Sequence, residues 1–218
     1  MMKIPIGIKV GSTENSEVVK DLLSSLVERN FTLACDQILF LLDGSKALKK
    51  GVNLVFKEQA LIQRCWLHKS RNIKAYLPDK YHKQSHLKLK AIMHMNSYKD
   101  AKKAYDLYYK WLNNISSEAA NSLEDAGEEL LTLHKLQVTG ELRKCLSSTN
   151  MIESLMSIIR TKSNRVKNWQ NTEQKIRWIA FIVNDAKGKF KRLRGTKQMA
   201  NILINNLNKN ITIDSLAA

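Results

Sequence analysis

Residues 38–43, with the sequence Ile-Leu-Phe-Leu-Leu-Asp, form an apolar run that ends in a carboxylate and is followed directly by Gly44-Ser45-Lys46. A short apolar run bounded by a turn signal is typical of a strand that is buried on both faces of a parallel or mixed sheet. Asp43 then lies at the carboxyl end of this strand. Because ligands of open α/β sheets bind outside these strand ends, Asp43 is a candidate functional residue. The alternative interpretation is that Asp43 caps a helix at 45–55.

The first 64 residues alternate between strand-like and helix-like patterns. In chain order, the expected elements are an edge strand at 3–10, a helix at 14–29 capped by Ser12 or Thr13, the strand at 38–42, a helix at 45–55 and a short strand at 60–63. Strands that alternate with helices at this rhythm predict an α/β sheet with right-handed crossover connections.

After Cys65 the pattern changes to helices only. Apolar residues at helical spacing, joined by short polar links, predict helices at 66–76, 85–95, 99–114, 117–134, 150–161, 172–190 and 198–208. We therefore expect a helical layer that is inserted behind the sheet.

The 218 residues carry a formal net charge of +16, which is typical of proteins that bind a polyanion such as DNA or RNA. The basic residues are unevenly spread. Residues 64–110 hold 12 Lys or Arg and 3 Asp, residues 141–197 hold 14 Lys or Arg and 4 acids, and residues 118–129 hold five acids and no base. A generally basic proteome is the alternative explanation, but the contrast favours defined basic faces.

Three cysteines, Cys35, Cys65 and Cys145, form an odd set without the spacing of a disulfide framework, which is typical of a reducing compartment. No stretch approaches the roughly 20 apolar residues of a membrane span, and residues 1–20 lack the apolar core of a signal peptide. From these patterns we expect a soluble intracellular protein without a membrane partner.

Cys65 and His68 form a Cys-x2-His pair, and His82 and His86 follow downstream. One interpretation is a zinc site, since Cys and His at short spacings bind Zn²⁺ tetrahedrally. A second is structural: Cys65 ends a buried strand and His68 begins the next helix, so each packs or hydrogen bonds locally. A third is a nucleophilic Cys65 with His68 as its base, although no orienting residue is evident nearby.

Glu153 is the second candidate carboxylate. Thr149 and Asn150 are typical of a helix start, which places Glu153 in the first turn, where the helix dipole favours a negative charge. The expected buried stripe of this helix consists of Ile152, Leu155, Met156 and Ile159. Glu153 stands at the margin of that stripe, so it either serves the dipole alone or converges with Asp43 on a metal ion.

A basic run follows this helix start and ends at Trp169. Its members are Arg160, Lys162, Arg165 and Lys167. Charge runs are commonly solvated faces. Directly after a candidate metal ligand, however, these residues also form a plausible strip for gripping DNA phosphates.

Five motifs, taken together, resemble the Mutator-like transposases of bacterial insertion sequences. They are Gly11-Ser12-Thr13-Glu14-Asn15, Leu26-Val27-Glu28-Arg29, Asp43-Gly44-Ser45-Lys46-Ala47-Leu48, Gln63-Arg64-Cys65-x2-His68-Lys69-x-Arg71-Asn72 and Ser148-Thr149-Asn150-x-Ile152-Glu153-Ser154. The resemblance spans nearly the whole chain, with the motifs in the same order.

This resemblance implies a ribonuclease-H-like core with an all-helical insertion before its last acid, and two Asp and one Glu that hold two Mg²⁺ ions. Asp43 would be the second of these acids and Glu153 the third. The implied division is 1–78 for the first part of the core, 79–140 for the insertion, 141–197 for the rest of the core and 198–218 for a C-terminal helix and tail.

The residues that we expect to contact DNA combine polar and basic members of these motifs with the basic run that follows Glu153. They are Lys46, Arg64, Lys69, Arg71, Asn150, Arg160, Lys162, Arg165 and Lys167. Cys65 and His68 belong to a family motif for which we expect a structural role.

The chain departs from the family pattern at its start. In the family, the first Asp lies on the first core strand, upstream of the segment that resembles residues 3–10. The first acid here is Glu14, which comes after that segment. We therefore expect an N-terminally truncated α/β core without its first strand and first catalytic Asp, and an incomplete two-ion Mg²⁺ site.

The expected function is that of a DDE-type DNA transposase, which cleaves and transfers strands at insertion-sequence ends in a metal-dependent reaction. We expect the isolated chain to bind DNA but to cut it poorly. Alternatives are a non-enzymatic DNA-binding remnant that inhibits an intact transposase, a fragment without a stable fold, and a zinc-dependent RNA-binding module. Expected partners are insertion-sequence ends, target DNA, and a second copy or an intact transposase, at the nucleoid in the cytoplasm.

Overall fold

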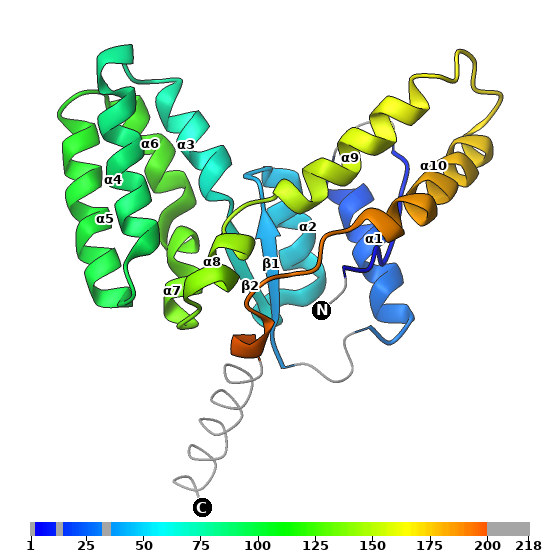
Figure 1. Cartoon of the computed structure of the whole chain (residues 1–218), viewed down its shortest axis with the longest axis horizontal. Coiled ribbons are helices and arrows are strands. Elements are labelled where there is room, and N and C mark those ends of the chain that lie inside the picture. Colours follow the sequence, from blue (N-terminus) through cyan, green and yellow to red (C-terminus); the bar gives the residue numbers. More distant parts are fainter. Residues whose placement is uncertain (1–2, 12–14, 32–35, 200–218) are drawn as a thin grey trace, which may run out of the picture. The chain divides into compact units, whose positions relative to one another are not determined.

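The computed structural model describes residues 3–11, 15–31 and 36–199. The chain divides into two compact units (Figure 1). The sheet unit comprises the described residues up to Cys65 together with residues 148–192, and the helical unit comprises residues 66–147 together with 193–199. The functional division at residues 78 and 140, which the resemblance implies, stays a prediction.

The sheet unit contains two parallel strands, β1 (Ile38–Leu42) and β2 (Ala60–Arg64), in the register Ile38 to Ala60 through Leu42 to Arg64. Helix α2 (Lys46–Phe56) and a short 3-10 helix (Lys57–Gln59) connect them. The expected strands and helix are therefore confirmed within a residue or two. Only Leu42 of β1 is buried and the other four residues are half-buried, because the described part of this sheet has only two strands.

Helix α1 (Ser16–Glu28) packs against α2. Its N-cap is Asn15, whose Oδ1 accepts from the Val18 amide at 2.9 Å. The prediction of Ser12 or Thr13 as the cap was wrong, because the helix begins at Ser16 and Asn15, directly before it, supplies the side-chain acceptor. Residues 12–14 lie outside the described part of the chain.

Residues 3–11 form no strand, so the predicted edge strand is wrong for the part of the chain that is described. The segment instead packs along α1: Arg29 Nη2 donates to the Ile6 carbonyl at 2.9 Å, and Lys9 pairs with Asp21 at 3.3 Å. Its three isoleucines, Ile4, Ile6 and Ile8, are exposed rather than held in a core. Alternation alone mimicked a strand here, since no strand among the described residues pairs with this segment.

Two further helices, α9 (Asn150–Ser163) and α10 (Thr172–Ala186), complete the sheet unit, and a short 3-10 helix (Lys187–Lys189) follows them. They pack through a small cluster of Leu155, Val183 and Ala186. The predicted buried stripe of α9 was partly wrong, because Ile152 and Met156 are 53% and 50% exposed. Residues on a helix are buried only where a neighbour covers them, and α10 covers the face that carries Leu155.

The helical unit is built from the elements that follow β2. They are α3 (Trp66–Lys74), a 3-10 helix (Asp79–Tyr81), α4 (His82–His94), α5 (Tyr98–Asn113), α6 (Ser117–Ala126), a 3-10 helix (Gly127–Leu131), α7 (Thr132–Lys135) and α8 (Gly140–Leu146). Their apolar faces enclose a core that includes Ile73, Tyr108, Leu112 and Leu123. The change to helices only after Cys65 is therefore confirmed.

The helix predicted at 117–134 is broken in the structure. Gly127 ends α6 with a φ of +50°, a conformation that glycine adopts far more readily than other residues. The chain continues as a 3-10 helix before α7 begins. Helix α8 was not predicted, and most of the helix expected at 198–208 lies outside the described residues.

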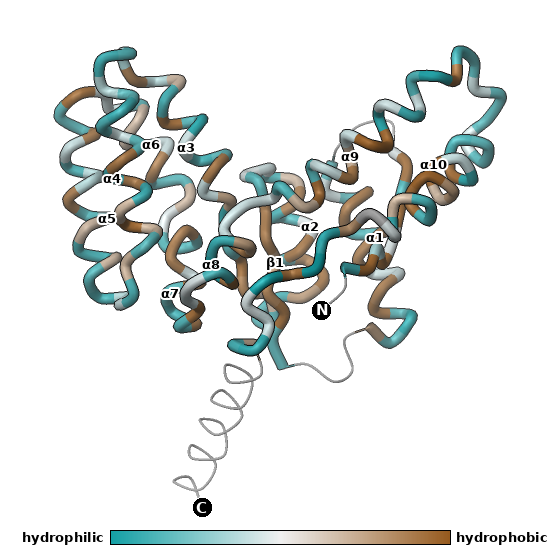
Figure 2. The backbone as a smooth tube through the Cα atoms, in the orientation of Figure 1, coloured by the Kyte–Doolittle hydropathy of each residue, from teal (hydrophilic) through white to brown (hydrophobic). Residues whose placement is uncertain are grey.

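Hydrophobic and hydrophilic residues alternate along the helices of both units, as expected of helices that each bury one face (Figure 2). Within the described ranges, none of the helices has the length and apolar character needed to cross a membrane.

His134 is a buried titratable group in the core of the helical unit. Its Nε2 lies 3.1 Å from the Ile92 carbonyl, and its ring contacts Trp66. Burial, and to a smaller extent the nearby charge of Arg143, lowers the pKa of His134 to about 4. The folded unit therefore favours the neutral imidazole, with Nε2–H as the donor to Ile92.

We expect Gly51→Ala to destabilise the sheet unit. A Cβ at Gly51 would lie 2.5 Å from Val19 Cγ1 and 3.3 Å from the Lys20 backbone nitrogen, so α1 would have to move away from α2. Overpacking of this kind costs about 1–3 kcal/mol, which urea unfolding would measure. Gly188→Ala is the matched control, because nothing lies within 4 Å of a Cβ there. Equal stability of the two variants would contradict the close packing of α1 and α2.

We also expect the stability of the helical unit to fall as the pH falls from about 6.5, the pKa of an unperturbed histidine, toward 4. The sign follows because the unfolded chain binds a proton on His134 in this range and the folded chain does not. Between pH 7.5 and pH 5 the loss from this one group is roughly 2 kcal/mol. Urea unfolding at both pH values should show a smaller loss for His134→Gln, and an identical loss in both proteins would contradict the role of His134.

Candidate functional site

Asp43 follows β1 and shapes the turn into α2. Its Oδ1 accepts from the Ser45 amide at 2.9 Å, and Ser45 in turn caps α2, with its Oγ accepting from the Leu48 amide at 3.3 Å. The alternative in which Asp43 itself caps the helix is therefore wrong. The half-buried Asp43 carboxylate stays at the strand end, held through one of its oxygens.

The end of β2 lies against the same turn. Arg64 is buried, and a Cβ at Gly44 would lie 3.2 Å from its Nη2. Gly44 has a φ of +131°, so the position demands glycine both for its backbone and for the close approach of the guanidinium. The backbone amide of Cys65, the next residue, donates to the Leu42 carbonyl at 2.7 Å and joins the two strand ends.

Thr149 connects this strand end to the start of α9. Its backbone amide donates to Cys65 Sγ at 3.4 Å, and its Oγ1 lies 3.4 Å from the same sulfur and 2.6 Å from Glu153 Oε1. A threonine hydroxyl has one hydrogen, which goes to the carboxylate as the stronger acceptor. Cys65 and Thr149 are both buried, so these contacts are shielded from water.

These contacts form a continuous series. It begins at Leu42, the neighbour of Asp43 in the chain, and passes through Cys65 and Thr149 to Glu153. All four residues belong to the sheet unit, in which the first turn of α9 lies beside the arrowhead end of β1 (Figure 1). The structure therefore brings the neighbourhoods of the two predicted acids to one end of the sheet. The sequence identified Thr149 only as part of a helix start and of a family motif, and its hydrogen bond to Glu153 was not predicted.

The described residues place no three or more His, Cys, Asp or Glu side chains together in a way that could hold a metal ion. Asp43 and Glu153 thus do not by themselves form the three-acid set that the resemblance implies. The Cys65 amide donates to the Leu42 carbonyl and its sulfur accepts from the Thr149 amide; the structural role expected for Cys65 stays a prediction. His82, from the alternative zinc set, lies within hydrogen-bond distance of the Lys74 and Leu77 carbonyls.

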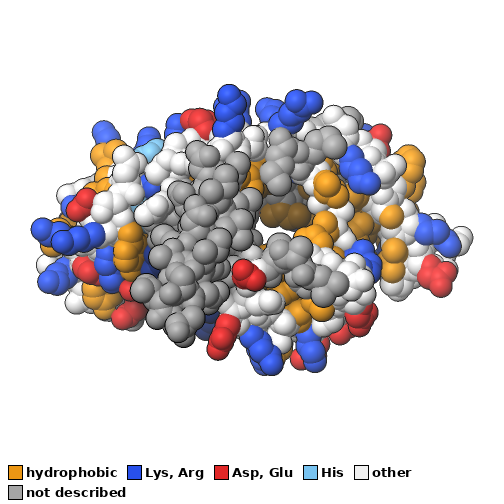
Figure 3. All heavy atoms as spheres, turned by 90° about the horizontal axis from the view of Figure 1, so that it is seen from below, with side chains coloured by type: hydrophobic (Ala, Val, Ile, Leu, Met, Phe, Trp, Pro, Cys, Tyr) orange, Lys and Arg blue, Asp and Glu red, His pale blue; other side chains and the backbone are white. Residues whose placement is uncertain are grey.

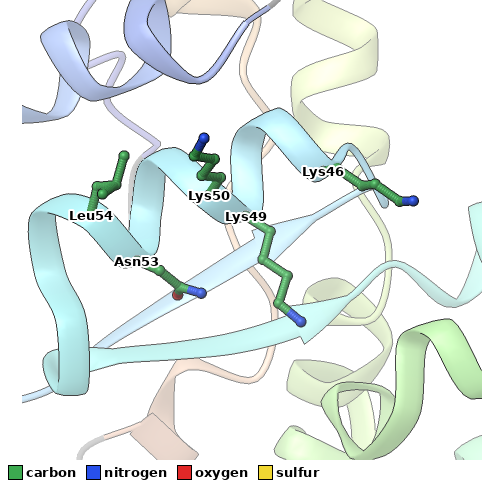
Figure 4. A pocket seen from close by; sticks show the side chains of 5 residues that line it. All are labelled: Lys46, Lys49, Lys50, Asn53 and Leu54. Atoms are coloured by element: carbon green, nitrogen blue, oxygen red, sulfur yellow. The ribbon is translucent and has the colours of Figure 1, made fainter.

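A basic strip that was only partly predicted follows Asp43 on α2. Lys46, Lys49, Lys50, Asn53 and Leu54 line an open pocket of about 390 Å³ (Figure 4). Lys49 and Asn53 point to one side of the helix and Lys50 and Leu54 to the other, while Lys46 extends past the helix start. The spacing of the three lysines along α2 was the available signal, and only Lys46 was selected from it.

The predicted DNA-contacting residues on α9 and beyond it are mostly exposed. Asn150, Arg160, Arg165 and Lys167 all lie on the surface. Lys162 is half-buried and pairs with Asp185 of α10 at 2.6 Å, which ties the two helices together. The exposed members of this strip are therefore well placed to meet a polyanion.

Lys69 and Arg71 both lie on α3 of the helical unit, but they differ in exposure to solvent. Arg71 is exposed. Lys69 is only 2% exposed, and its Nζ donates to the Ser122 carbonyl at 2.6 Å and to Asp125 Oδ2 at 3.2 Å. These contacts join α3 to α6 and give Lys69 a structural role. Arg64 is likewise buried, at the end of β2.

Comparison with known proteins finds that the chain is similar to transposases of bacterial insertion sequences. The transposase for insertion sequence element IST2 of Acidithiobacillus ferrooxidans is 25% identical over 168 residues, which are 77% of this chain and 54% of that protein. The transposase for IS6120 of Mycolicibacterium smegmatis is 28% identical over 165 residues, 74% of this chain and 48% of that protein. The transposase for IS1201 of Lactobacillus helveticus is 32% identical over 158 residues, 70% of this chain and 40% of that protein.

The chain spans about half the length of these curated relatives. The family model for transposases of the Mutator family matches residues 3–193. This match includes both units, both candidate acids and the contacts that connect them. The resemblance noted from the motifs is confirmed, and the chain belongs to the Mutator family of transposases.

Proposed function

We propose that this chain carries part of the catalytic core of a DNA transposase, in which Asp43 and Glu153 are two of the acids that bind divalent cations. The observation that carries the proposal is the sequence of contacts from Leu42 through Cys65 and Thr149 to Glu153, which joins two distant segments at the carboxyl end of β1. Ligands of open α/β sheets bind at this end. The parallel β1–α2–β2 arrangement also supports a ribonuclease-H-like core.

Carboxylate oxygens are the ligands that Mg²⁺ prefers, and a bound Mg²⁺ would stabilise negative charge that develops on a phosphodiester. The protein orients both carboxylates through hydrogen bonds from the Ser45 amide and the Thr149 hydroxyl. Two carboxylates are one fewer than the set that the resemblance implies. We therefore expect weak cation binding by this chain alone.

The proposed DNA contacts come from exposed cationic side chains. Lys46 lies beside Asp43 at the start of α2, and Arg160, Arg165 and Lys167 follow Glu153 along α9 and the turn after it. Phosphate contacts of this kind supply affinity and position without base specificity. The named relatives act for insertion sequences, so insertion-sequence ends are the proposed DNA, and a second copy or an intact transposase at the nucleoid is the proposed protein partner.

We expect the intact chain to bind Mn²⁺, used as a spectroscopic substitute for Mg²⁺, and Asp43→Asn and Glu153→Gln each to weaken that binding at least about tenfold. Electron paramagnetic resonance of free Mn²⁺ measures it directly. Thr149→Val keeps both carboxylates but removes the hydroxyl that orients Glu153, and loss of such supporting groups costs about 10–100-fold in metal affinity.

Asp36→Asn is the matched control, because Asp36 is an exposed acid in the same unit. It should bind Mn²⁺ like the unmodified chain. Mn²⁺ binding that is equal in the unmodified chain and in the Asp43→Asn, Glu153→Gln double variant would rule out the proposed pair of acids. DNA binding that persists without cations in that double variant would favour the non-enzymatic DNA-binding alternative.

We further expect DNA affinity to fall steeply with salt. Replacement of Arg160, Arg165 and Lys167 by Gln should reduce the slope of log affinity against log salt by about 0.9 for each phosphate contact that is lost. Fluorescence anisotropy with a labelled duplex at several salt concentrations gives this slope. Replacing three exposed lysines of the helical unit, Lys83, Lys90 and Lys103, removes the same charge and should change the slope less. An equal change in both triple variants would argue against a specific DNA strip on α9.

A further inference from the structure

The turn between α9 and α10, together with the first turns of α10, forms an open pocket of about 460 Å³. It is lined by Val166, Trp169, Gln174, Arg177, Trp178 and Phe181. Half of these residues are aromatic, and none of them belongs to the acid site. The volume lies within the roughly 300–1,000 Å³ that is usual for small-ligand sites.

Two of the aromatic residues form an exposed stacked pair. Trp178 and Phe181 lie one turn apart on α10, with ring centroids 6.0 Å apart and ring planes 28° apart. Their exposed fractions are 37% and 62%. In the right-hand part of Figure 3, hydrophobic side chains are exposed beside basic and some acidic side chains. Large exposed apolar groups gathered in this way mark a binding surface.

Backbone and side-chain hydrogen bonds fix the shape of the pocket. The Gln170 amide donates to Gln174 Oε1 at 2.8 Å, and the Gln174 amide donates to Asn171 Oδ1 at 2.8 Å. Asn171 is the N-cap of α10, and the two hydrogen bonds together hold the end of the turn against the first turn of the helix. Gln174 Oε1 accepts from the Gln170 amide. The Nε2 group of the same side chain is a hydrogen-bond donor that a ligand in the pocket can use.

The charges around the pocket specify what kind of ligand fits. Residues 164–178 hold four basic side chains, Arg165, Lys167, Lys175 and Arg177, and one acid, Glu173. Arg177 lines the pocket, and Arg165 and Lys167 flank Val166. The suitable ligand therefore has a flat apolar face and a nearby negative charge. An unpaired nucleotide has both, and proteins commonly bind single-stranded DNA by stacking its bases on aromatic side chains beside a basic groove.

We propose that this pocket binds an unpaired DNA base, which stacks on Trp178 and Phe181 while Arg177, Arg165 and Lys167 contact the adjoining phosphates. In a continuous duplex the faces of each base are covered by its neighbours, so only a base taken out of the stack can occupy the pocket. The proposal rests on the proposed DNA-binding function. It adds a site for locally unpaired DNA that is separate from the acids.

The test compares two short duplexes that differ at one position. In one, 2-aminopurine lies opposite an abasic site and is unpaired; in the other, it is paired with thymine. The full chain should bind the unpaired duplex about tenfold more tightly, in line with the usual strength of base–aromatic stacking. Binding should also quench the 2-aminopurine fluorescence, because stacking on an aromatic ring quenches it.

Trp178→Ala should abolish both the preference and the quenching, while the affinity for the paired duplex stays within about twofold. Phe181→Ala tests the same pocket with a more exposed side chain, should Trp178→Ala fail to fold as judged by circular dichroism. Trp178→Phe should retain most of the preference. Phe31→Ala, which removes an exposed aromatic ring elsewhere in the sheet unit, should behave like the unmodified chain.

Failure to bind either duplex would overturn the proposed DNA-binding function, and this proposal with it. Equal binding of the two duplexes without quenching would overturn the pocket proposal alone and leave DNA binding in place. Sedimentation of each variant distinguishes a further outcome. If Trp178→Ala converts a dimer into a monomer without changing the preference for the unpaired base, the face binds a second copy of the chain and the pocket proposal is wrong.

Discussion

Cys65 is the residue on which the arrangement of the candidate site depends. Its amide closes the ends of β1 and β2 through the Leu42 carbonyl, and its sulfur receives the Thr149 amide at the start of α9. Because Cys65 is buried, replacing its sulfur would leave the Thr149 amide without this acceptor in a region closed to water. The orientation of Glu153 follows from the same contacts, since the hydroxyl that holds its carboxylate belongs to Thr149.

The large positive charge of the chain has two different uses. Part of it is buried and structural: Arg143 donates to the carbonyls of Val138, Met93 and Met95 inside the helical unit, and Lys69 donates to Ser122 and Asp125. A buried cation is costly unless such acceptors surround it. Other cationic side chains are exposed, among them Lys46 and Lys50 on α2 and Arg160, Arg165 and Lys167 on α9 and beyond it. Exposed cations of this kind are available for contacts with DNA phosphates.

Much of the local structure could be predicted, because it depends on neighbours in the sequence. The apolar run before Asp43 is a strand, and the polar pair Thr149-Asn150 does start a helix. Predictions failed where a local pattern had two physical outcomes. Both Asp43 and Ser45 are good caps, and the structure uses Ser45; Gly127 can be tolerated in a helix or can end one, and here it ends α6. Ile152 and Met156 fit a buried stripe, but no element of the described part of the chain buries them.

The sequence by itself determined the β1–α2–β2 succession and most of the later helices, the two candidate acids and the uneven distribution of charge, because each of these follows from side-chain chemistry and short-range spacing. Tertiary structure alone decided that Glu153 connects to the strand end through Thr149 and Cys65, that Lys69 and Arg64 are buried rather than exposed, and that Trp178 and Phe181 share a pocket with Trp169. The physical reason is that long-range hydrogen bonds and burial depend on which distant segments pack together. The spacing of residues along the chain does not specify that packing.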